Sequence, residues 1–267
     1  MFAGGPESLE LAKWAFHRAF SLSPDLPIAH NLYTQLEADS GHAQAAMVRL
    51  LGQAEKHPND PELLGGLVQA CRYCGLLDES IRAHHRARRL DPKIVTSVAH
   101  TFFLMGEYDQ ALEWHPPGVR YYLELAILTA AGREDEAAGL LNHRAAPGGQ
   151  FPAMMESLRF YLQGDAAPSQ QIVRQGLAVQ PPPDPEATFY LVRQLARDGA
   201  HADALSAIRS LLTDGFCCST ALRGDPWLLT LSQLPDFQEV LDELLGREAD
   251  ARTAFEAAGG DRVLPAR

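Results

Sequence analysis

The sequence predicts an all-α protein built from stacked helical hairpins, that is, an α-solenoid. Alanine and leucine dominate, β-branched residues are sparse, and no stretch alternates with the period of two that a strand requires. Pro24, Pro58 and Pro92 follow one another at intervals of 34 residues. A proline also precedes a glycine by 14 residues four times, at Pro27/Gly41, Pro61/Gly75, Pro92/Gly106 and Pro185/Gly199. A fixed period in the thirties is typical of stacked repeats.

The repeated landmarks mark the ends of helices. Asp60-Pro61, Asp91-Pro92 and Asp184-Pro185 each place an N-cap acceptor before a proline, which costs no hydrogen bond at the first helical position. Glycines stand where a first helix is expected to end in a left-handed turn: Gly41, Gly75, Gly106, Gly132 and Gly199. A small residue follows early in each second helix, at Ala46, Ser80, Ala111, Ala137 and Ala204. Each unit is therefore predicted to be a helix–turn–helix hairpin.

The elements are expected in a simple order along the chain. A lone helix at 7–22 precedes hairpins at 27–58, 61–92, 93–115, 119–144, 151–179 and 185–215. A polyproline connector is expected at 180–185 and a long final helix at 236–258. These elements suggest three segments: an unpaired N-terminal helix (1–24), the repeats (25–215) and C-terminal capping helices (216–267).

The hairpin pattern resembles the tetratricopeptide repeat. The span 61–92 carries the repeat's landmarks at Leu64, Leu67, Cys71, Gly75, Ser80, Ala87 and Pro92. The span 27–58 carries them at Tyr33, Gly41, Ala46, Leu50 and Pro58. The repeats are degenerate, because the consensus tryptophan is replaced by His30, Leu64 or Val95, and the second-helix aromatic by Leu50, His84 or His115. The resemblance implies a right-handed solenoid whose first helices line a concave groove.

The two ends of the chain suggest a larger context. Trp14, Phe16 and Phe20 would be left partly bare on a helix without a partner, so we expect the chain to begin within a repeat, or else Phe2 and Pro6 to cover that face. Residues 185–267, with the string Asp-Pro-Trp-Leu at 225–228, resemble the end of repeat arrays in bacterial signalling proteins. Such arrays follow serine/threonine kinase, adenylate-cyclase-type or DNA-binding regulator domains. This resemblance implies, as an alternative function, the regulatory or sensory segment of a signalling enzyme.

The main functional prediction is a module that binds a protein or peptide partner in the concave groove. The position of each residue on its first helix selects ten side chains that point into it: Asn31, Gln35, Gln69, Arg72, Tyr73, His100, Phe103, Tyr122, Arg193 and Arg197. Arginine and aromatic residues dominate interface energies. Within this set, Phe103 and Tyr122 are the residues most readily explained by packing between repeats instead.

Composition and motifs exclude several classes of protein. A net charge of −11 disfavours binding to nucleic acid or to an anionic membrane. The chain has no run of 18 apolar residues and no signal-peptide core, which predicts a cytoplasmic protein. We find no phosphate-binding glycine loop, no nucleophile elbow, no zinc-protease motif and no kinase motif. We therefore predict no enzymatic activity and no cofactor.

Two local clusters admit a functional interpretation beside a structural one. Cys71 and Cys74, with His84 facing Cys71, offer three soft ligands, but zinc needs four, so buried packing is the preferred interpretation and no metal is predicted. Cys217-Cys218 is likewise interpreted as a turn and a core contact.

The basic run 82–89 is interpreted as a solvated face, with an acidic partner or a phosphate as the alternative. Core packing is the interpretation for Trp14, Trp114 and Trp227.

Overall fold

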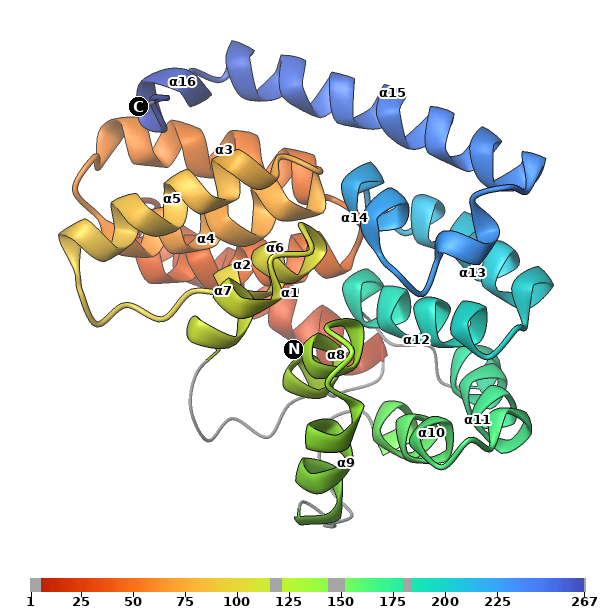
Figure 1. The fold of residues 1–267 in the computed structure, drawn as a ribbon. Helices are drawn as coiled ribbons and strands as arrows, with labels where there is room; N and C mark the ends of the chain where they lie inside the picture. Colours follow the sequence, from red (N-terminus) through yellow and green to blue (C-terminus); the bar gives the residue numbers. More distant parts are fainter. Residues whose placement is uncertain (1–5, 116–121, 144–151, 180–183, 267) are drawn as a thin grey trace. The chain divides into compact units, whose positions relative to one another are not determined.

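The structure, a computed structural model, describes residues 6–115, 122–143, 152–179 and 184–266. Within these ranges every regular element is a helix and no strand occurs (Figure 1). The predicted all-α class is thus confirmed. The expected connectors at Pro116-Pro117 and 180–183 and the loop at 146–149 lie outside the described residues, as does Phe2.

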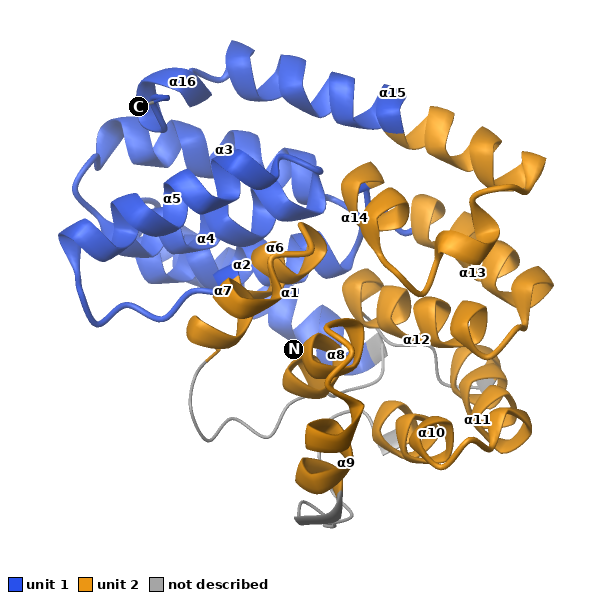
Figure 2. Cartoon of the chain, viewed as in Figure 1, with its two compact units in different colours: residues 1–98, 214–218, 245–267 blue, residues 99–213, 219–244 orange. Residues whose placement is uncertain are grey.

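The described chain forms two compact units, which are coloured separately in Figure 2. Unit 1 combines residues 1–98, 214–218 and 245–267, and unit 2 combines residues 99–213 and 219–244. Neither unit is a single continuous stretch of chain. Unit 1 joins the N-terminal helices to residues more than a hundred positions downstream.

Unit 1 is built on two consecutive helical hairpins. Its helices are α1 (Pro6–Leu22), α2 (Pro27–Asp39), α3 (Ala43–Lys56), α4 (Pro61–Tyr73), α5 (Leu77–Leu90), the second half of α15 (Pro235–Ala257) and α16 (Gly260–Val263). Helix α2 packs against both α3 and α4, and α4 packs against α5. The two first helices approach closely because Gly66 carries no side chain: a Cβ atom there would lie 3.4 Å from the Cα atom of Asn31.

Unit 2 repeats the hairpin arrangement. Its helices are α6 (Val98–Leu104), α7 (Tyr108–Glu113), α8 (Tyr122–Ala130), α9 (Glu134–His143), α10 (Pro152–Leu162), α11 (Ala166–Val179), α12 (Pro185–Arg197), α13 (His201–Thr213), α14 (Ser219–Gly224), the 3-10 turn η1 (Leu229–Leu231) and the start of α15. Consecutive helices pair as α8 with α9, α10 with α11 and α12 with α13.

The predicted helix ends are confirmed at most positions. The side chains of Asp60 and Asp184 accept hydrogen bonds from the backbone N–H groups of Glu62 and Glu186, at 2.9 and 2.8 Å. All five predicted turn glycines, and also Gly164, have φ between 72° and 84°. The predicted lone helix at 7–22 and long helix at 236–258 correspond to α1 and α15.

The third hairpin departs from the prediction. Asp91 forms the expected contact, accepting from the N–H of Lys93 at 2.8 Å, but no helix follows until Val98. Ile94, Val95 and Thr96 are β-branched residues, which lose side-chain freedom in a helix. The non-helical segment bonds to the preceding hairpin instead, since the hydroxyl of Thr96 lies 2.7 Å from Nδ1 of His84.

Helix α1 is the most exposed of the unit 1 helices. Phe16 and Phe20 pack on the rings of Tyr33 and His30, with centroids 5.2 and 4.6 Å apart. Trp14, however, is 65 % exposed, so its assignment to the core is wrong, whereas Trp227 is buried as predicted. No helix among the described residues is both long and apolar enough to span a bilayer.

Candidate partner-binding surface

Three of the predicted groove residues lie on the first helices of unit 1 and remain accessible. Asn31 and Gln35 on α2, and Gln69 on α4, are all half-buried. The amide of Asn31 donates a hydrogen bond to Glu62 at 2.7 Å, which links the two first helices. The polar edge of this surface is therefore made of amides and one carboxylate.

The other two unit 1 residues of the predicted set are not on a surface. Arg72 is 2 % exposed, and its guanidinium donates to the carbonyl and hydroxyl oxygens of Ser97 at 3.1 and 2.9 Å. Tyr73 is 1 % exposed and meets the ring of Phe216 edge-on. Both side chains hold together parts of unit 1, because they contact segments outside the repeat that carries them.

Arg193 is the clearest correction to the predicted groove. Its side chain is fully buried in unit 2 and donates from Nε to Oδ2 of Asp225 at 2.5 Å. The guanidinium lies between two rings, 4.9 Å from the centroid of Phe103 and 4.4 Å from that of Trp227. The C-terminal segment at Asp225–Trp227 thus covers a position that the helical pattern assigned to the groove.

Phe103 and Tyr122 are also buried, in agreement with the packing interpretation of these two residues. Their rings surround Tyr190, with centroids 5.4 and 5.3 Å from its ring. Burial raises the pKa of Tyr122 to about 12, although the nearby positive charge of Arg193 acts in the opposite direction. These residues form an aromatic core rather than a contact surface.

Arg197 is the exposed arginine of the predicted set, and it belongs to a polar chain across three helices. Its Nε donates to the hydroxyl of Tyr161 at 3.1 Å, and that hydroxyl donates to Oε1 of Glu134 at 2.6 Å. The guanidinium also lies 5.8 Å from the centroid of the Tyr161 ring. Partial burial, followed by the bond to Glu134, raises the pKa of Tyr161. We call Glu134, Tyr161 and Arg197 the Arg197 surface.

The Arg197 surface packs on a buried aromatic residue. The ring of Tyr161 lies 4.9 Å from that of the buried Trp227, which limits the orientations that the tyrosine can adopt. Its arginine and tyrosine come from α12 and α10, the first helices of two consecutive hairpins. His100, the last predicted residue, is half-buried, with Nδ1 at 2.9 Å from the hydroxyl of Tyr190 and 3.4 Å from Oε2 of Glu186.

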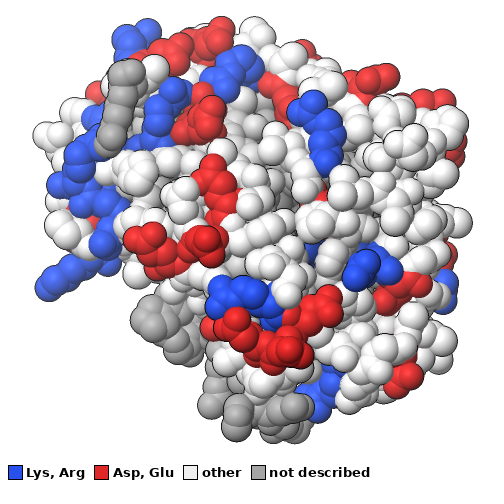
Figure 3. Space-filling view, in the orientation of Figure 1, with Lys and Arg blue, Asp and Glu red and all other residues white. Residues whose placement is uncertain are grey.

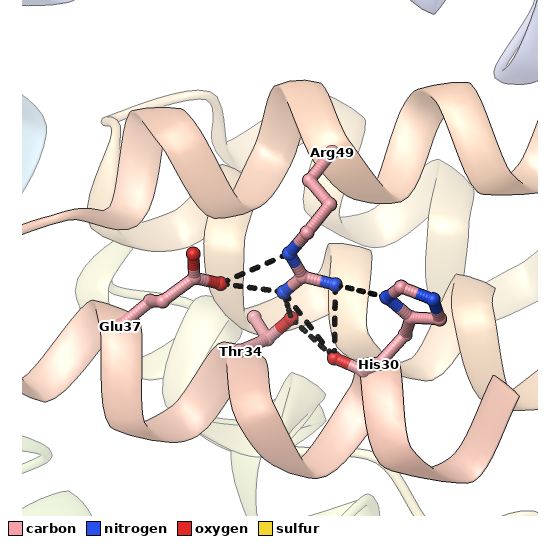
Figure 4. Close-up of polar contacts among 4 residues, drawn as sticks. All are labelled: His30, Thr34, Glu37 and Arg49. Atoms are coloured by element: carbon pink, nitrogen blue, oxygen red, sulfur yellow. Dashed lines mark hydrogen bonds and ion pairs between the residues drawn. The ribbon is translucent and has the colours of Figure 1, made fainter. Parts of the chain in front are cut away.

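A second polar cluster, in unit 1, fixes the first hairpin (Figure 4). Arg49 on α3 donates to Nδ1 of His30, to the hydroxyl of Thr34 and to Oε2 of Glu37, at 2.7, 2.9 and 2.5 Å. Because arginine only donates, Nδ1 of His30 must accept, and its Nε2–H is left to donate to the carbonyl of Pro24 at 2.8 Å. Burial first, and the Arg49 charge in addition, lower the pKa of His30. The arrangement suits a neutral imidazole in a structural contact.

The cysteines are placed as packing residues. Cys71 and Cys74 are both buried, and burial is the main cause of the raised pKa of each thiol. His84 is buried as well, and its pKa is lowered to about 4, mainly by burial. Among the described residues, no group of three or more histidine, cysteine, aspartate or glutamate side chains is arranged to hold a metal ion.

Sequence reasoning missed three residues that determine these sites. Arg49 and Tyr161 belong to no sequence motif, and their roles depend on the residues that they contact in the folded chain. Asp225 belongs to the Asp-Pro-Trp-Leu string, but its pairing with Arg193, 32 positions away, has no local signal. No local signal marks Arg193 as buried either, because its helical position shares a face with the exposed Arg197.

Comparisons with other proteins add no further assignment. No protein-family model matches the sequence, and no curated protein sequence matches it either.

Proposed function

We propose that this chain is a tetratricopeptide-like solenoid that binds a segment of a partner protein on the surface of its first helices. The observation that carries the proposal is the Arg197 surface, where an exposed arginine and a restrained tyrosine stand on adjacent first helices. Tyrosine and arginine are enriched among the residues that contribute most to interface energies, and a side chain that is already held in place loses less entropy on binding.

Support for the repeat type comes from three features of the hairpins. The predicted glycines adopt the left-handed conformation, two of the three predicted caps begin first helices, and α2 packs against α4 as first helices do in a stack. The alternative, a regulatory segment of a bacterial signalling enzyme, stays a prediction from the resemblance of residues 185–267 and from the unpaired N-terminal helix.

The partner segment is expected to carry a carboxylate beside an apolar side chain. Arg197 offers a planar fork of donors that fits a carboxylate, and the face of Tyr161 offers apolar area next to it. Unit 1 offers a separate candidate contact: Asn31, Gln35 and Gln69 supply amide donors and acceptors of the kind that bind the backbone of an extended peptide.

The experiment is a selection of peptides from a random display library on the purified chain, followed by fluorescence-anisotropy titration. We expect enriched peptides to contain aspartate or glutamate, and Arg197→Glu to weaken their binding by about tenfold or more. Arg174→Glu is the matched control, because Arg174 is an exposed, ion-paired arginine of the same unit that lies on a second helix, α11. Equal affinity for the native chain and for Arg197→Glu would refute the assignment of this surface.

A further inference from the structure

A cleft of about 560 Å³ lies in unit 1 between α5 and the C-terminal residues 262–265. Its volume falls in the range of small-molecule sites. Four arginines line it, and we call it the arginine cleft: Arg82, Arg86 and Arg89 from α5, and Arg262 from α16. The basic run that the sequence suggested to be a solvated face thus forms one wall of a cleft.

The spacing of the α5 arginines explains why they share one wall. Positions 82, 86 and 89 are separated by four and three residues, so the three side chains project from one face of the helix. Arg262 reaches the cleft from a segment far along the chain. In Figure 3, Lys and Arg atoms gather at the left of the view, over the end of α5.

Two arginines of the cleft, Arg86 and Arg89, contact no carboxylate among the described residues, so their positive charge is not neutralised there. Arg86 donates to the carbonyl of Pro58 at 2.7 Å and to that of Val263, and neither acceptor carries a charge. Arg89 is exposed and has no hydrogen bond or ion pair with any described residue.

The other two are paired with carboxylates. Arg82 contacts Glu79 at 2.6 Å, and Glu79 also contacts Arg252 at 2.6 Å. Arg262 contacts Glu55, with Nε at 3.1 Å, yet its side chain is 74 % exposed. Among the residues that the structure describes, two carboxylates therefore contact the four arginines, in a chain whose net charge is −11.

We propose that the arginine cleft binds a phosphorylated small molecule. A phosphate group presents several acceptor oxygens and carries close to two negative charges at neutral pH, so it can bridge guanidinium groups that approach from two sides. Arg89 and Arg262 are the two that would hold it, since Arg89 has no hydrogen bond or ion pair with a described residue and Arg262, although it contacts Glu55, is largely exposed. Leu264 and Pro265 give the same cleft an apolar wall against which the organic part of the ligand packs.

The chemistry favours phosphate over a single carboxylate. Glu55 already pairs with Arg262, and Glu79 is shared between Arg82 and Arg252. What remains is a site with excess positive charge on two facing elements, which a multivalent anion satisfies better than a monovalent one. Two kinds of ligand carry such a phosphate group, inorganic pyrophosphate and an organic phosphate monoester, and the test separates them.

The test is isothermal titration calorimetry of the full chain with inorganic pyrophosphate and, separately, with adenosine monophosphate, at physiological ionic strength. Binding of both probes identifies phosphate as the recognised group, and binding of the nucleotide alone shows that the apolar wall is required. Either result supports the proposal only if Arg89→Gln and Arg262→Gln each weaken binding about tenfold or more, as expected for the loss of a charge-assisted contact.

The matched control is Arg174→Gln, which removes an exposed arginine from unit 2 and should leave the affinity unchanged. Circular dichroism of each variant checks that the helices are retained, and Arg89 suits this test because it is exposed and has no hydrogen bond or ion pair with a described residue. Absence of heat with both probes at millimolar concentration would overturn the proposal. The proposal would also be overturned if Arg89→Gln left the affinity unchanged, or if Arg174→Gln reduced the affinity as much as Arg89→Gln does. The variants differ from those of the Arg197 surface, so the two proposals fail independently.

Discussion

Replacement of Arg193 by methionine tests whether the buried ion pair stabilises unit 2. Methionine keeps most of the aliphatic volume between the rings of Phe103 and Trp227 but removes the charge. Among the described residues, Asp225 would then keep one hydrogen bond, from the N–H of Trp227 at 2.8 Å, on a side chain that is 5 % exposed.

The expected loss follows from that geometry. Removal of one partner from a buried pair leaves an uncompensated charge and costs about 3–5 kcal/mol of the free energy of unfolding. Asp225→Asn is expected to cost a similar amount, because it leaves the fully buried guanidinium without its counter-charge. The double variant Arg193→Met/Asp225→Asn removes both charges, so we expect it to recover at least about 2 kcal/mol relative to the sum of the single changes.

The assay is urea unfolding followed by tryptophan fluorescence, to which Trp227 contributes directly beside the substituted position. Arg209→Met is the control, because Arg209 pairs with Asp236 at 3.0 Å while both side chains are more than half exposed. An exposed pair contributes less than about 1 kcal/mol. The reasoning is refuted if Arg193→Met costs no more than Arg209→Met, or if the two single changes at the buried pair add without any recovery.

Three other perturbations test the description of the two units. The pKa of His84 is lowered to about 4 in the folded chain, so the unfolded chain binds a proton first as the pH falls. The free energy of unfolding should therefore be highest above pH 6.5 and fall by about 2–3 kcal/mol by pH 4. Thermal melts over this pH range should show a smaller decrease for His84→Gln. Arg49→Met should cost about 2–3 kcal/mol in chemical unfolding, whereas Arg174→Met should cost less than about 1 kcal/mol. Gly215→Ala should cost more than about 2 kcal/mol in thermal melts, because φ is 85° and the new Cβ would lie 2.6 Å from the Cα atom of Gly41. Gly199→Ala should cost only about 1 kcal/mol, because no atom lies within 4 Å of the new Cβ. A flat pH profile, or equal costs within either matched pair, would contradict the corresponding explanation.

The ends of the hairpins were predictable because they depend on local chemistry. A left-handed turn requires a residue such as glycine, and an aspartate before a proline caps a helix, so Gly41, Gly75 and Asp60 indicate their roles without reference to the rest of the chain. The same local rule failed at Asp91, where the cap contact formed but the β-branched residues after it did not continue as a helix.

The candidate site was less predictable because burial depends on segments far away in the sequence. Arg193 and Arg197 are one helical turn apart on α12, and the pattern placed both in one groove. In the structure Trp227 covers the first and leaves the second exposed. The periodicity of a helix shows which residues share a face, but it carries no information about what covers that face.

The composition of unit 1 from distant stretches has a consequence for synthesis on the ribosome. Its first hairpins are complete by residue 98, but Arg252 and Val263, which contact Glu79 and Arg86, follow only after all of unit 2 has been made. At synthesis rates of about 5–20 residues per second, the N-terminal hairpins wait roughly ten to thirty seconds for these contacts. During that interval the outer faces of α3 and α5 are open to other proteins, so unit 1 is expected to acquire its final stability late, even though its helices are made first.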